Sequence, residues 1–288
     1  MSGPECCENP PALSSRSGHG SVLELGGFNT YVSGPPTSKR AILFVSDVYG
    51  TLPFINPYIF MNFGQLGSAP FGTLISAFDV RRINFFDFSG NFNILLSQFF
   101  AGYEAPNLRR LADKVAAAGY YVVVPDFLCG DPYTTDKPLS IWIQSHGTEK
   151  GFEDAKQVVA ALKDRGISAI GAAGFCWGAK VVTELAKSDN IQAAVLLHPS
   201  FVKVDDMKEV KAPIAILAAE IDKISPPEII KQFEEILSSK PEVDKFVKIF
   251  PSAKHGWTVR YNVEDKAAVQ QAEEAHQDML DWLTKHVK

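Results

Sequence analysis

The residues best suited by type and spacing to carry out chemistry lie at positions 171–178, which read Gly-Ala-Ala-Gly-Phe-Cys-Trp-Gly. Cys176 stands between two glycines at the spacing G-x-C-x-G, the pattern of a nucleophile elbow with sulfur in place of a serine oxygen. An apolar stretch precedes it and a helix-forming stretch follows, so Gly174 and Gly178 permit a sharp turn where a Cβ would clash. The turn places Cys176 at a helix N-terminus, where the dipole favours a thiolate. The alternative is a buried structural cysteine without chemistry.

A thiol nucleophile needs a base, and the base needs an orienting acid. Hydrolases that use this elbow supply the acid and then the histidine later in the chain, each after its own strand. Asp222 lies just past an expected strand at 213–218, in Ala-Glu-Ile-Asp-Lys, and His255 follows an expected strand at 246–250 through the loop Pro-Ser-Ala-Lys-His-Gly. The order predicts a catalytic triad of Cys176, Asp222 and His255.

Other acids and histidines compete for these roles. Glu220 is near Asp222 but closer to the strand end, His198 belongs to a Leu-His-Pro strand end, and His276 and His286 fall in an expected terminal helix. A solvated aspartate and an ordinary loop histidine remain the alternative interpretations of Asp222 and His255. Three suitable residue types in the required order favour the triad.

The elements that must position these residues alternate between strands and helices. Apolar runs and turn signals predict a hairpin at 22–32 and strands at 41–46, 120–124, 167–173, 193–197, 213–218 and 246–250. Helical periodicity and end signals predict helices at 105–119, 152–162, 179–187, 227–237 and 267–286. This alternation is typical of βαβ units with a mostly parallel sheet flanked by helices. Together with the motif order it predicts an α/β-hydrolase formed by one domain over residues 1–288.

The composition of the chain argues against several classes of function. The 288 residues are 46% hydrophobic and 21% charged, with a formal net charge of -5. This charge argues against nucleic acid or an anionic membrane as a partner. The start of the chain lacks an apolar signal region, and its four cysteines form no disulfide framework, so we expect a cytoplasmic protein. No C-x-x-C or H-E-x-x-H motif is present, and we expect neither a metal nor a cofactor.

Gly-Phe-Cys-Trp-Gly, Ala-Glu-Ile-Asp-Lys and His-Gly-Trp together resemble the dienelactone hydrolase (carboxymethylenebutenolidase) family, and both ends of the chain resemble its plant members. The resemblance covers residues 1–50 and 102–288. It implies a cysteine hydrolase that acts on lactones or activated esters, small-molecule substrates, through an acyl-enzyme. It also implies that the oxyanion is held by the backbone amides of Trp177 and Val48.

Two positions depart from the family pattern. Bacterial members carry a glutamate that contacts the resting thiol, and this chain has Asp47 in the matching Ser-Asp-Val-Tyr-Gly. They also place an arginine four residues beyond the histidine to bind a substrate carboxylate, whereas here Val259 takes that place and Arg260 follows it. The resemblance therefore makes Asp47 the candidate for modulating the thiol and Arg260 the candidate for binding substrate.

Residues 51–101 fit neither the alternation nor the resemblance. They separate Asp-Val-Tyr-Gly from Gly-Tyr-Glu-Ala-Pro-Asn and contain 11 of the 20 phenylalanines but no lysine or glutamate. Residues 51–78 carry no charge, but Pro53, Pro57 and Pro70 interrupt them and argue against a membrane-spanning helix. Our hypothesis is a retained intron translated in frame, and the alternative is a native lid over the active site. The segment starts beside Val48, so we expect it to impair the oxyanion site.

Other functions remain open. Some plant relatives are named endo-1,3;1,4-β-glucanase, but glycoside cleavage usually needs two carboxylates flanking the bond. A protein in which Cys176 is oxidised or only binds a ligand is another possibility, and an inactive splice form is a third.

Overall fold

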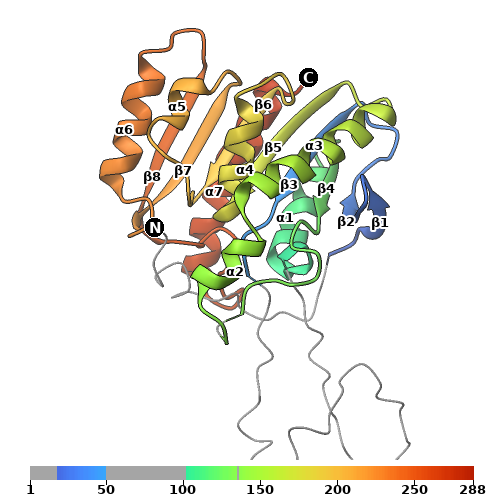
Figure 1. Cartoon of the computed structure of the whole chain (residues 1–288), viewed down its shortest axis with the longest axis horizontal. Coiled ribbons are helices and arrows are strands. Elements are labelled where there is room, and N and C mark those ends of the chain that lie inside the picture. The colour runs from blue at the N-terminus through green and yellow to red at the C-terminus, as the bar shows by residue number, and fades with distance from the viewer. Residues whose placement is uncertain (1–17, 50–101, 135) are drawn as a thin grey trace, which may run out of the picture. The chain divides into compact units, whose positions relative to one another are not determined.

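The computed structural model describes residues 18–49, 102–134 and 136–288 (Figure 1). The predicted insertion at 51–101 lies outside the described residues. Within the described parts, the chain forms one eight-stranded sheet in the order β1-β2-β4-β3-β5-β6-β7-β8. The strands from β4 through β8 along this order pair in parallel, whereas β1, β2 and β4 pair antiparallel at the other edge. The predicted mostly parallel sheet is confirmed.

The strands are β1 Ser21–Leu25, β2 Phe28–Ser33, β3 Arg40–Val45, β4 Tyr121–Pro125, β5 Ala169–Phe175, β6 Ala193–Leu197, β7 Ile214–Ile221 and β8 Lys245–Lys254. The helices are α1 Pro106–Ala116, α2 Leu139–Ser145, α3 Thr148–Asp164, α4 Trp177–Ala186, α5 Asp206–Glu209, α6 Pro227–Ser238 and α7 Lys266–His286, with a 3-10 turn at Gly102–Glu104. At least one helix lies between each pair of parallel strands that follow one another in the chain, as βαβ units require.

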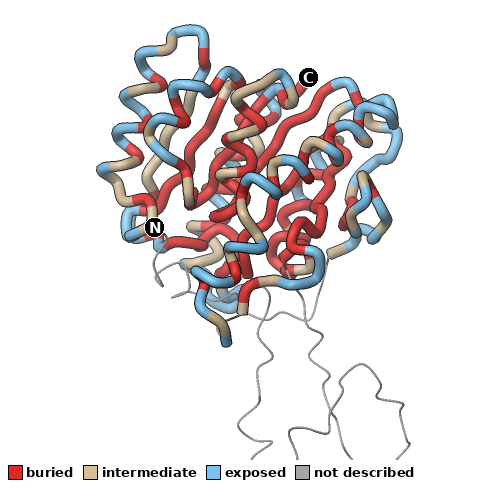
Figure 2. The backbone as a smooth tube through the Cα atoms, in the orientation of Figure 1, coloured by how far each residue is buried: buried red, intermediate tan, exposed pale blue. Residues whose placement is uncertain are grey.

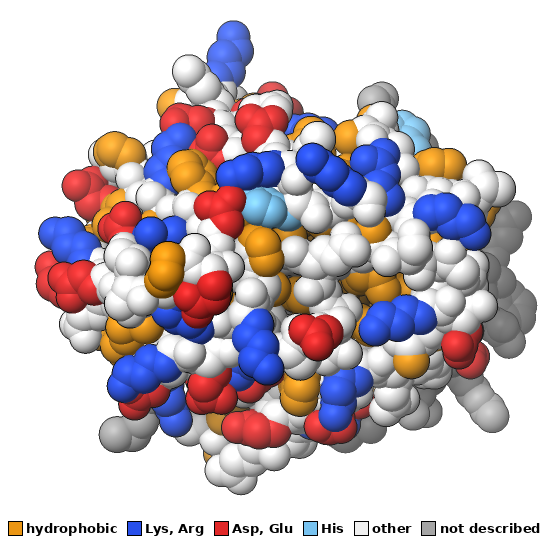
Figure 3. Space-filling view, turned by 90° about the horizontal axis from the view of Figure 1, so that it is seen from above, with side chains coloured by type: hydrophobic (Ala, Val, Ile, Leu, Met, Phe, Trp, Pro, Cys, Tyr) orange, Lys and Arg blue, Asp and Glu red, His pale blue; other side chains and the backbone are white. Residues whose placement is uncertain are grey.

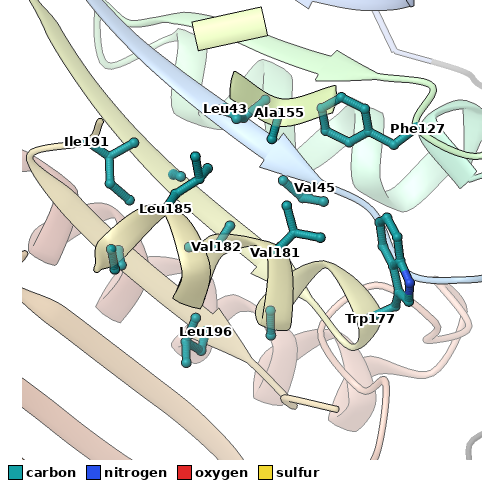
Figure 4. Packing of buried hydrophobic residues seen from close by; sticks show 14 of the residues in the cluster. Leu43, Val45, Phe127, Ala155, Trp177, Val181, Val182, Leu185, Ile191 and Leu196 are labelled. Atoms are coloured by element: carbon teal, nitrogen blue, oxygen red, sulfur yellow. The ribbon is translucent and has the colours of Figure 1, made fainter. Parts of the chain in front are cut away.

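Helices cover both faces of the sheet, and the pattern along β3 shows why. Leu43 and Val45 belong to one apolar cluster with side chains of α3, α4 and α6, while Ile42 and Phe44 belong to the opposite cluster with α1 and α7. Figure 4 shows Val181 of α4 lying close to Val45. Successive strand side chains point to opposite faces, so a strand buried on both sides must be apolar throughout. Figure 2 accordingly shows the central strands buried along their lengths.

The structure departs most from the predicted elements at the ends of β7 and β8, at the start of α3 and in two additional short helices. β8 extends to Lys254 through Pro251, which a strand can accommodate here because β8 is at the edge of the sheet. β7 continues to Ile221, and α3 begins at Thr148 rather than at residue 152. The short helices α2 and α5 were not predicted.

No helix among the described residues is both long enough and apolar enough to span a bilayer. On the face shown in Figure 3, acidic and basic side chains are interspersed rather than gathered into a patch of one sign.

Candidate functional site

The three residues of the predicted triad follow three parallel strands of the sheet. Cys176 comes directly after β5, Asp222 directly after β7 and His255 directly after β8. His255 therefore does not need the separate loop that the sequence indicated, because β8 is longer than predicted. Carboxyl ends of parallel strands meet at one edge of a sheet, and that edge is the usual place for a site in this architecture.

Cys176 occupies a backbone conformation that few residues adopt. Its φ is 53° and its ψ is -110°, between the end of β5 and the start of α4. A Cβ added to Gly174 would lie 2.3 Å from the Gly178 carbonyl oxygen, and one added to Gly178 would lie 2.1 Å from the Val45 carbonyl oxygen. Both glycines are thus required by the close approach of backbones, as the sequence predicted. The strand before Cys176 and the helix after it together hold the cysteine in this strained conformation.

His255 and Asp222 form a buried pair. His255 Nδ1 lies 2.7 Å from Asp222 Oδ2, and both side chains are almost fully buried. Asp222 Oδ1 also accepts hydrogen bonds from the backbone amides of Ile224 at 2.8 Å and Ser225 at 3.3 Å. These contacts fix the carboxylate, which in turn fixes the orientation of the imidazole ring.

A register shift at the end of β7 distinguishes Asp222 from its competitor. The pairing with β8 is irregular between Ala219 and Ile221. Glu220 is exposed there and accepts a hydrogen bond from the Ser252 backbone amide at 2.7 Å. Bulges of this kind redirect side chains at sheet ends. The acid beside His255 is Asp222, as the sequence predicted, while Glu220 binds the backbone of β8.

The electrostatics of His255 depend on its two partners. Burial lowers the pKa of His255, but the negative charge of Cys176, hydrogen bonds with Asp222 and Cys176, and the charge of Asp222 outweigh burial and raise it to about 9. A ring with such a pKa is protonated at neutral pH. His255 is therefore an imidazolium that lies between Cys176 and the Asp222 carboxylate.

The two other buried histidines near the sheet differ from His255 in their protonation. His198 Nε2 lies 2.8 Å from Thr258 Oγ1, and burial holds the pKa of His198 well below its usual value. His276 Nε2 lies 2.8 Å from the Thr258 carbonyl oxygen, and burial lowers its pKa to about 4. His198 packs edge-on against His255 with ring centroids 5.1 Å apart. It is a neutral neighbour of the imidazolium, while His276 lies in α7, as predicted.

Asp47 and Arg260, to which the resemblance assigned separate roles, bind each other. Arg260 Nε donates to Asp47 Oδ2 at 2.6 Å, with both side chains buried, and the guanidinium stacks 4.3 Å from the centroid of the Tyr49 ring. Burial raises the pKa of Asp47; the charge of Arg260 opposes this rise and the charge of Cys176 adds to it. The pair thus lies within electrostatic reach of the thiol. Val259, in the family's arginine position, is also buried.

Val48 and Trp177 lie on two segments that approach closely. Val48 is fully buried and its carbonyl accepts a hydrogen bond from the Tyr133 amide at 2.7 Å. A Cβ on Gly178 would meet the Val45 and Ser46 carbonyl oxygens, so the first turn of α4 packs directly on the segment leading to Val48. The Trp177 indole donates to the His146 carbonyl at 2.9 Å and ties this turn to the end of α2.

Ser200 is a residue of the site that the sequence did not indicate. Its Oγ lies 3.3 Å from Cys176 Sγ and 3.5 Å from His255 Nε2, and the residue is fully buried. The available signal was its position just after β6, the strand beside β5. Among the residues that the structure describes, no group of three or more histidine, cysteine or acidic side chains is arranged to hold a metal ion.

Comparisons with known proteins identify relatives of this chain. The dienelactone hydrolase family model matches residues 92–287. A Zea mays protein named endo-1,3;1,4-beta-D-glucanase is 36% identical over 248 residues, which cover 83% of this chain and 63% of that protein. A Xenopus tropicalis carboxymethylenebutenolidase homolog is 32% identical over 204 residues, covering 67% of this chain and 82% of the relative. The chain thus spans less than two thirds of the maize relative's length.

A solved esterase from Pyrococcus furiosus shares the fold, with a TM-score of 0.56 at 16% identity over 96% of this chain and 99% of the esterase. The sheet topology and this likeness define an α/β-hydrolase. The family match and the Xenopus relative further show that the chain belongs to the dienelactone hydrolase family.

Proposed function

We propose that this chain is a cysteine-dependent hydrolase of lactones or activated carboxylic esters that works through an acyl-enzyme. The observation that supports it most is the position of Cys176, whose sulfur interacts with a His255 ring that Asp222 holds at 2.7 Å. A thiolate paired with an imidazolium is an activated nucleophile that needs no further base for the first attack.

Acylation begins when the Cys176 thiolate forms a bond to the carbonyl carbon and the carbonyl π electrons move to oxygen. In our proposal the amides of Trp177 and Val48 stabilise this oxyanion. Loss of one such donor raises the activation free energy by about 3 kcal/mol. When the tetrahedral intermediate collapses, the carbon–oxygen ester bond breaks and His255 Nε2 gives its proton to the leaving alkoxide. In a lactone, that alkoxide stays attached to the acyl group.

Deacylation reverses the role of the base. Neutral His255 takes a proton from water as the hydroxide oxygen bonds to the acyl carbon, and collapse of this intermediate breaks the carbon–sulfur bond. The products are the carboxylic acid, the thiolate and the imidazolium. Asp222 keeps Nδ1 protonated and the ring oriented through both stages.

Asp47 and Arg260 bear on substrate choice. Asp47 is our candidate for modulating the thiol, because its charge interacts with Cys176. Arg260 is the candidate for binding a substrate carboxylate, which would have to compete with Asp47 for the guanidinium. Neutral esters and lactones avoid that competition, and we expect them to be turned over more readily than anionic ones.

The name of the maize relative raises endo-1,3;1,4-β-glucanase as a second candidate. Glycoside hydrolysis requires one carboxyl group that donates a proton and a second that attacks or activates water. Here Asp222 binds His255 and two backbone amides, while Asp47 binds Arg260. Because both carboxylates beside the thiol are engaged, acyl transfer is the better supported reaction.

Incubation with p-nitrophenyl esters, a lactone panel and a mixed-linkage β-glucan tests these alternatives. We expect chromophore release and an acyl adduct on Cys176 by mass spectrometry, both absent in Cys176→Ala. His255→Ala should lose turnover, whereas Cys129→Ala, which alters an exposed cysteine, should behave as wild type. Glucan cleavage retained in Cys176→Ala would overturn the proposal, and oxidation of Cys176 without turnover would favour a redox role.

A further inference from the structure

The backbone of Ser200 is fastened to the nucleophile elbow. The Cys176 amide donates to the Leu197 carbonyl at 3.1 Å, and the Ser200 amide donates to the Cys176 carbonyl at 3.0 Å. His198 and Phe201 adopt positive φ values of 41° and 62°, so the segment turns tightly beside the elbow. Ser200 is thus held rigidly next to Cys176.

The Ser200 hydroxyl lies between the sulfur and the imidazole. The distances are 3.3 Å to Cys176 Sγ and 3.5 Å to His255 Nε2, at a position with no exposure to solvent. A hydroxyl group buried this deeply is costly unless it makes hydrogen bonds. Its partners here are the nucleophile and the base.

The protonation of His255 sets the direction of these hydrogen bonds. The raised pKa of about 9 keeps a proton on Nε2 at neutral pH. Nε2–H can therefore donate to Ser200 Oγ as well as to the sulfur, and the hydroxyl hydrogen is then directed to the sulfur. A hydroxyl that accepts from a cation and donates to an anion is polarised in the sense that strengthens both bonds.

The other charged groups around the sulfur do not replace this donor. Asp47 binds Arg260 and the Tyr49 amide, and the charges of Asp47 and Cys176 oppose each other, so Asp47 does not favour a thiolate. Arg260 is engaged with Asp47, Asp222 acts through His255, and His198 is neutral beside the ring. Donors to a thiolate must therefore come from His255 and from neutral groups such as the Ser200 hydroxyl.

We propose that the Ser200 hydroxyl donates a hydrogen bond to the resting Cys176 thiolate and thereby sets the fraction of Cys176 that is ionised at neutral pH. The proposal rests on the proposed function in taking Cys176 as the nucleophile. No proton leaves Ser200 in the resting state, and its hydroxyl acts as a donor only.

The test is a pH titration of the ultraviolet absorbance of the thiolate, taken as a difference between each protein and the same protein with Cys176→Ala. We expect Ser200→Ala to move the midpoint of Cys176 upward by about one pH unit or more, the effect of losing a hydrogen bond to a charged group. Ser200→Thr, which keeps the hydroxyl, should restore the midpoint. Thr183→Val, which removes another fully buried hydroxyl that donates to the Ala179 carbonyl, should leave it unchanged.

A Ser200→Ala midpoint within about 0.3 pH units of wild type, or an equal upward shift in folded Ser200→Thr, would overturn the proposal. If Ser200→Thr does not fold, the Ser200→Ala midpoint still decides. The titration uses no substrate, so its result is independent of the ester assay: absent turnover contradicts the proposed function, while an unmoved midpoint contradicts the role of Ser200.

Discussion

The Tyr49 carbonyl oxygen accepts a hydrogen bond from the Gly102 backbone amide at 2.9 Å. These residues stand on either side of residues 50–101, yet their backbones are in direct contact. If 51–101 were removed, Tyr49, Gly50 and Gly102 would be consecutive, and the same bond would close a three-residue turn. The distance supports our proposal that one hydrolase domain is interrupted by 51–101, the segment that we interpret as a retained intron.

The deletion of residues 51–101 should fold and hydrolyse p-nitrophenyl esters faster than the full chain. The segment begins close to Val48, and disturbing one oxyanion donor costs about a hundredfold or more in rate. Turnover of both proteins at equal concentration measures the effect, with Cys176→Ala in the deletion as the blank. Equal activity of the two proteins would argue for a native lid, as would a single long transcript across codons 45–107 in every tissue.

The protonation of His255 predicts how stability depends on pH. Its pKa is raised to about 9, above the unfolded value of 6.5, so its stabilising contribution is complete below pH 6.5 and lost as the pH rises through 9. Cys176→Ala removes the charge that raises this pKa while burial continues to lower it. The His255 titration followed by NMR should therefore move to lower pH in Cys176→Ala, and an unmoved titration would contradict the ion pair.

Asp222→Asn should lower kcat about a thousandfold or more with little change in KM. The amide cannot hold Nδ1–H as the carboxylate does, so the imidazole loses its orientation and charge partner. Glu220→Gln is the matched control, because Glu220 is exposed and accepts a hydrogen bond from the Ser252 amide rather than from His255. It should retain activity within a few-fold, and comparable losses in both variants would argue against the assignment of the acid.

Gly178→Ala should destabilise the protein by about 2–3 kcal/mol, because the new Cβ would lie 2.1 Å from the Val45 carbonyl oxygen. The shift that relieves this contact also moves Trp177 away from the segment of Val48, so ester hydrolysis should fall as well. Gly147→Ala is the control, since its Cβ meets only the end of the Glu149 side chain at 3.2 Å and the Ile143 carbonyl at 4.0 Å. Urea unfolding compares the two variants, and equal stabilities would contradict the close packing at the elbow.

An ion-pair network joins α4 to α5 behind the elbow. Asp206 binds Lys180 and Lys187 at 2.8 Å each and the Lys203 amide at 2.7 Å. Burial raises the pKa of Asp206, but the hydrogen bonds from both lysines outweigh it, so the net pKa is lowered. This contribution is present above the unfolded pKa of about 3.9 and is lost as the pH falls through the lower folded value.

Asp206→Asn should therefore cost about 1–3 kcal/mol in the free energy of unfolding near neutral pH. The difference from wild type should shrink in acid, as Asp206 becomes protonated in both states. Asp205→Asn changes the neighbouring, exposed carboxylate that pairs with Lys208, and its effect should stay below about 0.5 kcal/mol. Thermal melts at several acid pH values measure the stability of both variants. Identical curves for the two variants would contradict a stabilising network around Asp206.

The sequence predicted the parallel sheet and the position of Cys176, Asp222 and His255 after three of its strands, because both follow local rules. Buried parallel strands are apolar throughout, and the residues after them must meet at one edge. Gly174 and Gly178 predicted the elbow because a Cβ would clash where the backbones of a sharp turn approach closely. The extent of β8 could not be predicted, because a proline ends most strands and only the position of β8 at the edge makes Pro251 acceptable.

Contacts between residues far apart in the chain could not be predicted from the sequence. Ser200 follows a strand like many other residues, and its meeting with Cys176 depends on β5 and β6 being neighbours. The binding of Arg260 to Asp47 joins residues 213 positions apart, so the two were assigned separate roles. The seven-residue α2 is too short for helical periodicity to stand out.

The positive φ of Cys176 sets stability against activity at a single position. An L-residue at φ 53° and ψ -110° stores backbone strain that glycine would not feel. Selection for thermostability alone would therefore favour glycine at position 176 and discard the thiol. Stability of the fold therefore does not explain why a cysteine occupies this conformation, and the explanation must lie in another property of the residue.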